Sequence, residues 1–205
     1  MKVTRVARSK HVPDRYYLTL EDGSSLKVGL NQIADYAVYE GRDLTEEELA
    51  SLTDDARETN TRARALRILG ERNMSKKQMT ERLIQKGEDP ELSRETAQWL
   101  EEVGAIDDGA YASLIVRHYA ARGFGAGKIK NELYRRGIPR EYWEDALEEL
   151  PDMEEAAYRF LQSRLRGAEP DAGSLKRASD AAYRRGFSWE EIRTALSRYQ
   201  TEHGE

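Results

Sequence analysis

The sequence contains no cysteine among its 205 residues, so it can form neither a disulfide nor a thiolate metal site. This absence fits a reducing cytosol. The sequence also has no apolar run near the roughly 20 residues that a membrane-spanning helix needs, and its first ten residues lack the apolar core of a signal peptide. We therefore expect a soluble, cytoplasmic protein.

Large apolar residues are scarce as well, because Leu, Ile, Val and Phe together make up just under a fifth of the chain. Such a composition would indicate disorder if the net charge were also large, but the net charge is only −5. Alanines and tyrosines complete the helical apolar stripes, so the composition favours several small cores with contacts mainly between neighbouring modules. The acidic balance argues against a protein held to nucleic acid by bulk charge alone.

A unit of three short helices recurs along the chain at a period of about 50 residues. The copy at 105–150 begins with an aspartate pair before a helical apolar stripe, and glycines follow its first and second helices. The glycines that close each second helix, Gly87, Gly137 and Gly186, are 50 and 49 positions apart. Apolar residues recur eight, four and three positions before each of them: Met79, Ile129 and Ala178; Leu83, Leu133 and Ala182; Ile84, Tyr134 and Tyr183. The sequence therefore predicts three tandem three-helix repeats.

The N-terminal part differs from the repeats. Short runs of β-branched and aromatic residues at 3–7, 16–20 and 25–28 predict three strands, and the turn pair Asp22-Gly23 favours an antiparallel meander. We expect a helix over 31–39 to cover one face of the sheet. Thr45 and Glu48 form a capping box, which predicts a helix from that point to about Asp55.

The predicted fold is therefore mostly α-helical: three tandem three-helix repeats in an elongated curved array, preceded by a small α+β unit with a β-meander. The predicted organisation is an N-terminal unit at 1–58, repeats at 59–104, 105–151 and 152–200, and a frayed tail at 201–205. In the third repeat we expect a loop over 167–173, a second helix from Ser174 and a third helix over 188–199.

No group of residues in the sequence predicts catalysis or metal binding. Asp107 and Asp108 are adjacent and would point in different directions on a helix, so an N-cap and first-turn charge explain them better than a shared metal. The three histidines show no ligand or nucleophile–base spacing. The glycine-rich stretch 123–127 lacks the preceding strand and the lysine–hydroxyl ending of a phosphate loop, which favours a helix–helix connection. The sequence thus predicts neither an enzyme nor a cofactor.

Basic residues recur at both ends of each second helix. Those at the C-terminal end complement the helix dipole, whereas those at the start lack such a reason. If the repeats stack in register, they could form a broken basic strip that binds phosphate or an acidic partner, but a solvated face explains them equally well. Together with two arginines of the central repeat, the candidate binding residues are Lys76, Lys77, Lys86, Arg117, Arg122, Lys128, Lys130, Arg135, Arg136, Lys176, Arg177, Arg184 and Arg185.

Three segments carry a resemblance to a known family. Residues 73–87 end in a Leu-x-x-Lys-Gly pattern, residues 106–112 follow the pattern Ile-Asp-Asp-x-x-Tyr-Ala, and residues 122–125 read Arg-Gly-Phe-Gly and are followed by Ile129, Leu133 and Gly137-Ile138. In this order they resemble the RecX family, bacterial regulators of the RecA recombinase. With the repeats, the resemblance covers 60–200, and the β-rich leader is similar to the extension of the longer members. It is weakest in the third repeat, where Ala178 and Ala182 stand at positions of larger residues.

The resemblance implies a non-enzymatic modulator in homologous recombination, DNA repair and the SOS response. Family members bind the RecA–DNA filament, lie along its groove and inhibit its ATP hydrolysis and strand exchange. The implied partners are therefore the RecA filament and single- or double-stranded DNA, without a membrane or a small-molecule substrate, and the expected state is a monomer. Two other classes stay open from the residues alone: a protein that binds nucleic acid directly, and a helical scaffold that binds a peptide or a protein.

Overall fold

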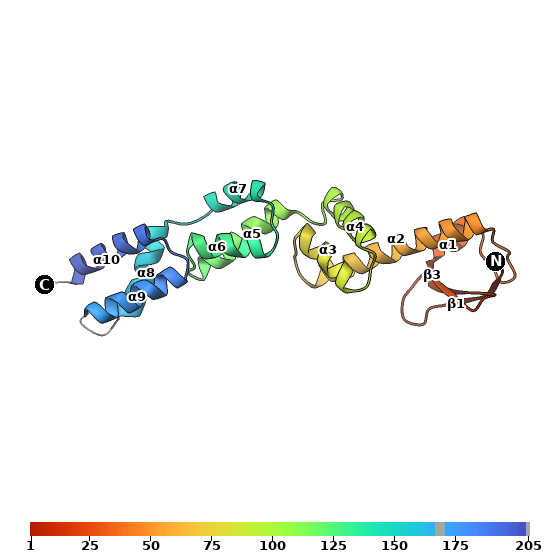
Figure 1. Ribbon diagram of the computed structural model, residues 1–205, viewed down its shortest axis with the longest axis horizontal. Helices are drawn as coiled ribbons and strands as arrows, with labels where there is room; N and C mark the ends of the chain where they lie inside the picture. The colour runs from red at the N-terminus through yellow and green to blue at the C-terminus, as the bar shows by residue number, and fades with distance from the viewer. Residues whose placement is uncertain (167–170, 204–205) are drawn as a thin grey trace. The chain divides into compact units, whose positions relative to one another are not determined.

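The computed structural model describes residues 1–166 and 171–203, which form three β-strands, ten α-helices and one 3-10 turn (Figure 1). The chain divides into two compact units. The first comprises 1–72 and 79–99, and the second comprises 73–78 and 100–205. The mostly helical fold with a small N-terminal sheet agrees with the prediction. The expected curvature of the array concerns how its parts sit relative to one another and stays a prediction.

The sheet of the first unit is the predicted antiparallel meander, in the order β1-β2-β3 (Val3–Arg8, Arg15–Leu20 and Ser25–Gly29). Gly23 has a φ of 82° in the turn between β2 and β3, and the Asp22 carboxylate accepts a hydrogen bond of 2.9 Å from the Ser24 amide. The inward side chains of the sheet, such as Leu18, pack with Leu52 of helix α2 into one apolar core. The alternation of buried and solvated positions thus fixes the register.

Two helices of this unit differ from their predicted lengths. Helix α1 covers Leu30–Asp35 and does not reach residue 39, because the chain turns at Ala37, whose φ is 45°. Helix α2 begins at the predicted capping box but runs over Glu46–Glu71 without a break near Asp55. Residues 56–69 include neither glycine nor proline, so nothing ends the helix near Asp55. The predicted boundary between residues 58 and 59 falls inside α2.

The other helices follow in groups of short elements. They are α3 (Lys76–Gln85), α4 (Pro90–Glu102), α5 (Asp108–Ala121), α6 (Ala126–Arg135), the 3-10 turn η1 (Arg140–Tyr142), α7 (Trp143–Glu148), α8 (Met153–Leu165), α9 (Ala172–Arg184) and α10 (Trp189–His203). In the second unit, α5 to α7 enclose one apolar core around Ile115, Ile129 and Leu133, and α8 to α10 enclose another around Leu161 and Ile192. Each group of three helices therefore has a core of its own.

Helices α9 and α10 also differ from their predicted ends. Helix α9 begins at Ala172, because the Asp171 carboxylate caps it through the Ser174 amide. Helix α10 continues to His203, past Thr201, from which we predicted a frayed tail. Tyr158 of α8 donates a hydrogen bond to Glu202 and thereby holds the last turn. The rest of the predicted tail, 204–205, and the part 167–170 of the predicted loop lie outside the described residues.

The repeated glycines end α3, α6 and α9 as predicted. Gly87, Gly137 and Gly186 have φ values of 87°, 69° and 93°, the left-handed conformation that glycine adopts without steric cost. The residues four positions earlier, Leu83, Leu133 and Ala182, are fully buried. Those three positions earlier, Ile84, Tyr134 and Tyr183, are exposed, so this column of the repeat does not belong to the cores.

Candidate interface of basic residues

The start of α3 packs within the second unit through side chains. The Ser75 hydroxyl donates a hydrogen bond to the carbonyl of Arg136, and the Lys76 amide donates one of 3.0 Å to Oδ1 of Asp108. Asp108 is almost fully buried, and this burial raises the pKa of its carboxyl, opposed by the bond from Lys76. The side chain of Lys77 covers Gly137. The positions of Lys76 and Lys77 are therefore explained by packing.

Of the aspartate pair at the start of α5, Asp107 is the N-cap that the sequence predicts. Its Oδ1 accepts a hydrogen bond of 2.8 Å from the Ala110 amide. Asp108 lies in the first turn of α5, and its carboxylate accepts the hydrogen bond from the Lys76 amide at the start of α3. Within residues 1–166 and 171–203, no group of acidic or histidine side chains could hold a metal ion.

The start of α6 packs on the end of α9 through the backbone. The amides of Gly125 and Gly127 donate hydrogen bonds of 3.0 and 2.9 Å to the carbonyls of Arg185 and Gly186. A Cβ atom on Gly125 would overlap the carbonyl group of Gly186. The glycine-rich stretch is thus a helix connection, as predicted, and also the contact between the second and third groups of helices. The sequence did not reveal this second role.

Arg185 strengthens the same contact. Its Nη1 donates hydrogen bonds of 2.7 and 3.2 Å to the carbonyls of Arg122 and Gly123. Its guanidinium also lies over the rings of Phe124 and Phe160, with centroid distances of 4.6 and 5.2 Å. Cation–π contacts of this kind stabilise a partly desolvated guanidinium. Arg185 therefore acts as a structural link rather than as a free cation.

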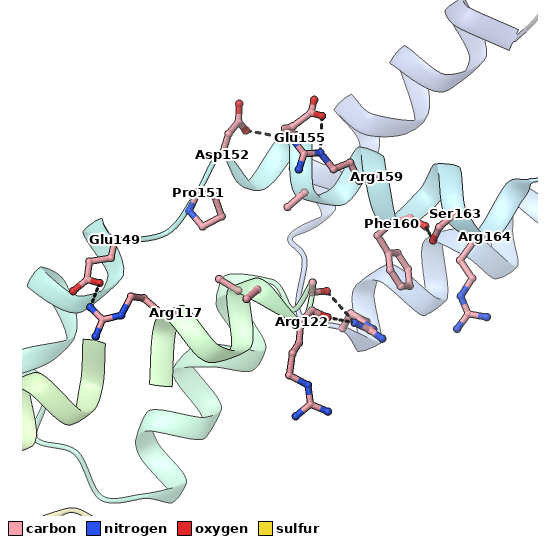
Figure 2. A pocket seen from close by; sticks show the side chains of 15 residues that line it. Arg117, Arg122, Glu149, Pro151, Asp152, Glu155, Arg159, Phe160, Ser163 and Arg164 are labelled. Atoms are coloured by element: carbon pink, nitrogen blue, oxygen red, sulfur yellow. Dashed lines mark hydrogen bonds and ion pairs between the residues drawn. The ribbon is translucent and has the colours of Figure 1, made fainter. Parts of the chain in front are cut away.

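A groove of about 800 Å³ lies beside Arg185, between α5 and α8 (Figure 2). Two of its arginines are paired with carboxylates: Arg117 with Glu149 at 2.7 Å, and Arg159 with Glu155 at 2.9 Å. Arg122 contacts the ring of His118, and Arg164 lies over Phe160. Figure 2 shows the side chains of Arg122 and Arg164 extending away from the acidic residues of the groove. This end of the groove is therefore positively charged.

A buried carboxylate holds two further candidates in α6. Glu132, 5% exposed, accepts hydrogen bonds of 2.8 Å from Arg135 and 2.7 Å from Arg136. Burial alone would raise the pKa of Glu132, but hydrogen bonds from Arg135, Arg136 and Tyr119 outweigh it and lower the pKa to about 2. Arg136 also donates to the Tyr111 hydroxyl. Arg136 is thus engaged in packing, whereas Arg135 keeps most of its side chain in solvent.

The thirteen candidates therefore fall into three groups. Six are engaged in ion pairs, hydrogen bonds or packing as described above, namely Lys76, Lys77, Arg117, Arg135, Arg136 and Arg185. Arg122 and Arg177 are intermediate, because Arg122 contacts the ring of His118 and Arg177 interacts electrostatically with Asp171. In the described ranges the remaining side chains are exposed and have no ion pair: Lys86, Lys128, Lys130, Lys176 and Arg184. Lys86 belongs to the first unit and the other four to the second. The binding role of these residues stays a prediction.

The sequence reasoning missed two arginines of the groove, Arg159 and Arg164. Both lie on α8 and line the groove together with Phe160, over whose ring the Arg164 guanidinium lies. A helical projection of α8 would have placed them beside the exposed face, but only the fold brings this face next to Arg117 and Arg122. No helix of the described chain is long and apolar enough to cross a membrane.

Comparisons with known proteins now add to this geometry. The family model described as RecX, second three-helix domain, matches residues 107–147. A regulatory protein RecX of Halorhodospira halophila is 30% identical over 135 residues, which cover 65% of this chain and 84% of the relative. A regulatory protein RecX of Chromohalobacter salexigens is 31% identical over 141 residues, which cover 68% of this chain and 93% of the relative. A regulatory protein RecX of Clostridioides difficile is 23% identical over 201 residues, which cover 96% of this chain and 94% of the relative.

Two solved structures share the fold. The crystal structure of a regulatory protein RecX has a TM-score of 0.74 at 20% identity, covering 96% of this chain and 98% of its own. The crystal structure of RecX from Lactobacillus salivarius has a TM-score of 0.64 at 20% identity, and the match covers 71% of this chain and 97% of that structure's chain. At this identity the two structures support the fold alone.

Proposed function

The chain belongs to the RecX family of regulatory proteins, and we propose that it binds the filament that the RecA recombinase forms on DNA and lowers its ATP hydrolysis and strand exchange. In this proposal it acts in the cytoplasm, as a monomer, and catalyses no reaction itself. The modules would clamp or block neighbouring positions of the filament through several weak contacts, which together bind strongly.

The observation that carries the proposal is the set of unpaired cations on the second helices. Lys128 and Lys130 lie in the first turns of α6, and Lys176 and Arg184 lie near the two ends of α9; all four are exposed and without an ion pair in the described chain. Arg136 and Arg185, in contrast, are engaged in packing. Corresponding helices therefore offer free positive charge to an acidic protein surface or to phosphate.

The test is ATP hydrolysis by the cognate RecA on single-stranded DNA, with this protein added below the recombinase concentration. We expect inhibition, and we expect the double variant Lys128→Glu and Lys130→Glu to need about tenfold more protein, because two exposed contacts of about 0.5 kcal/mol each are replaced by repulsion. The matched control is Arg57→Glu with Arg67→Glu, two exposed arginines of α2. This control changes the net charge equally and should inhibit like the unchanged protein.

The outcomes separate the parts of the proposal. Equal inhibition by both double variants would remove the α6 lysines as contacts while keeping the filament as the partner. Absence of inhibition at every ratio, in a protein that is folded by circular dichroism, would overturn the filament proposal.

A further inference from the structure

Tyr183 and Trp189 form an exposed aromatic pair in the third group of helices. Tyr183 lies in the last turn of α9, and Trp189 is the first residue of α10. Their rings stack with a centroid distance of 4.8 Å and an interplanar angle of 17°, although 53% and 51% of these residues are exposed. The left-handed turn at Gly186 brings the two rings together.

The pair is not part of the apolar core beneath it. Ala182 and Phe187, which lie next to the pair along the chain, are buried and fill the core together with Ile192. Removing either exposed ring would therefore leave this core intact. Two large aromatic faces held parallel in solvent form a surface on which a further flat ring can stack.

Exposed cations lie near the aromatic pair along α9 and α10. Lys176 lies seven residues before Tyr183, two turns away on the same face of α9, and Arg193 follows Trp189 by one turn. These two and Arg184 are exposed and have no ion pair in the described chain. Three carboxylates are also near along the helices: the half-buried Asp180 and Glu191 and the exposed Glu190. The Glu191 carboxylate accepts a hydrogen bond of 2.7 Å from the Ser188 amide at the start of α10. The three cations are all exposed, whereas two of the three carboxylates are half-buried.

We propose that Tyr183 and Trp189 are a stacking platform for the bases of a single-stranded nucleic acid, whose phosphates lie against Arg184, Lys176 and Arg193. Aromatic side chains with a positive surround bind single strands in this way, because every base has a π-face and every nucleotide a phosphate. Protein interfaces are instead depleted of charge at their centres. The bases of a duplex are already stacked on each other, so the platform discriminates against double strands.

The second group of helices offers an internal comparison. Tyr134 occupies the position of Tyr183 and is 72% exposed, but Arg140 stands where the third group has Trp189. Arg140 lies over the ring of Trp143, 5.2 Å from its centroid. Because Arg140 replaces the tryptophan, Tyr134 has no stacked aromatic partner at the position that corresponds to Trp189. We therefore assign the stacking site to the third group of helices.

The experiment measures binding of the full chain to fluorescein-labelled oligothymidine and to a duplex of equal length by fluorescence anisotropy. We expect Trp189→Ala or Tyr183→Ala to weaken oligothymidine binding by about 5- to 100-fold, the usual effect of losing one stacked base, with little change for the duplex. Trp189→Phe should retain most of the affinity. The matched control is Tyr39→Ala, an exposed tyrosine of the first unit, which should bind like the unchanged protein.

Salt separates the two kinds of contact. Arg184→Gln should reduce the salt dependence of binding by about one phosphate contact, whereas Trp189→Ala should lower the affinity at every salt concentration without changing that slope. Equal oligothymidine binding by Trp189→Ala and Tyr39→Ala, or equal losses on single and double strands, would overturn the proposal. So would normal oligothymidine binding combined with lost inhibition of RecA, which would make the pair a protein contact. Because the oligonucleotide assay contains no recombinase, failure here leaves the filament proposal standing.

Discussion

The same glycine ends the second helix in all three repeats, yet its surroundings differ. Gly87, Gly137 and Gly186 all have a positive φ. A Cβ atom on Gly87 would meet nothing within 4 Å, one on Gly137 would meet the side chain of Lys77, and one on Gly186 would overlap the backbone of Lys128. The left-handed turn is thus shared by the three repeats, whereas the close approach of another segment is not.

The difference shows how neighbouring segments dock on the turn. At Gly137 the contact uses side chains, the Ser75 hydroxyl and the stem of Lys77, which can adjust. At Gly186 it uses two amide–carbonyl bonds from Gly125 and Gly127, and these allow no intervening side chain. The three equivalent glycines therefore share one backbone conformation, but each is packed against different neighbours.

The variant Gly186→Ala tests this comparison with the largest expected effect. The left-handed conformation costs an alanine about 1–2 kcal/mol, and the added methyl group must also separate α9 from α6, which costs about 1–3 kcal/mol more. We expect a loss of about 4 kcal/mol in the free energy of unfolding, measured by urea denaturation. The matched control, Gly87→Ala, should lose about 1 kcal/mol, because only the backbone strain applies. Equal losses for the two variants would mean that the backbone contact of Gly186 contributes nothing.

The sequence was sufficient to locate these three turns, because a glycine after a basic residue at a constant period is a local signal. It could not tell which turn is covered, because Lys128 is 58 positions from Gly186 and nothing local marks their approach. The uninterrupted helix α2 was in principle readable, since its middle contains no helix breaker. The predicted start of the first repeat at residue 59 falls inside this helix.

The same limit applies to the candidate interface. Glu132 precedes Arg135 and Arg136 by three and four positions, a spacing at which helical side chains pair, so the sequence contained the signal that these arginines are engaged. Arg185 instead donates to carbonyls about 62 residues away in the sequence. No local spacing in the sequence indicates this contact. Sequence reasoning therefore proposed thirteen cations, and the fold was needed to separate the free from the engaged.

Arg136 and Arg185 extend the comparison, since they occupy the same column. Arg136 is held by the carboxylate of Glu132, whereas Ala181 stands at the corresponding position in the third repeat, and Arg185 is held by carbonyls and rings. The pKa of Glu132 is lower in the folded chain than in the unfolded chain, where it is about 4.5. Its stabilising contribution is thus fully present above pH 4.5 and is lost as the pH falls toward 2.

We expect Glu132→Gln to lose about 2–3 kcal/mol of unfolding free energy at pH 7, because it leaves the half-buried Arg136 without a carboxylate. The difference from the unchanged protein should shrink as the pH falls from about 4.5 to about 2. Urea denaturation at a series of pH values measures this difference, and other carboxylates cancel because both proteins contain them. A difference that stays constant over this range would show that Glu132 acts through shape and not through charge. Arg185→Gln provides the comparison, with a loss that should not depend on pH in this range.

The smallest expected effect is the coupling between Gly137 and Lys77, where backbone strain and a movable neighbour combine. A Cβ atom there would lie 3.0 Å from Cβ and Cγ of Lys77 and would overlap its Cδ, but the lysine side chain can rotate away. We expect Gly137→Ala to lose about 2 kcal/mol, between Gly87→Ala and Gly186→Ala. The double variant with Lys77→Ala removes the overlapping atoms, so its loss should be smaller than the sum of the two single losses by about 0.5–1 kcal/mol, as measured by a double-mutant cycle in urea. If the loss of the double variant equalled the sum of the two single losses, the Lys77 side chain would not clash with the added methyl group. The turn at Gly137 would then resemble the open turn at Gly87.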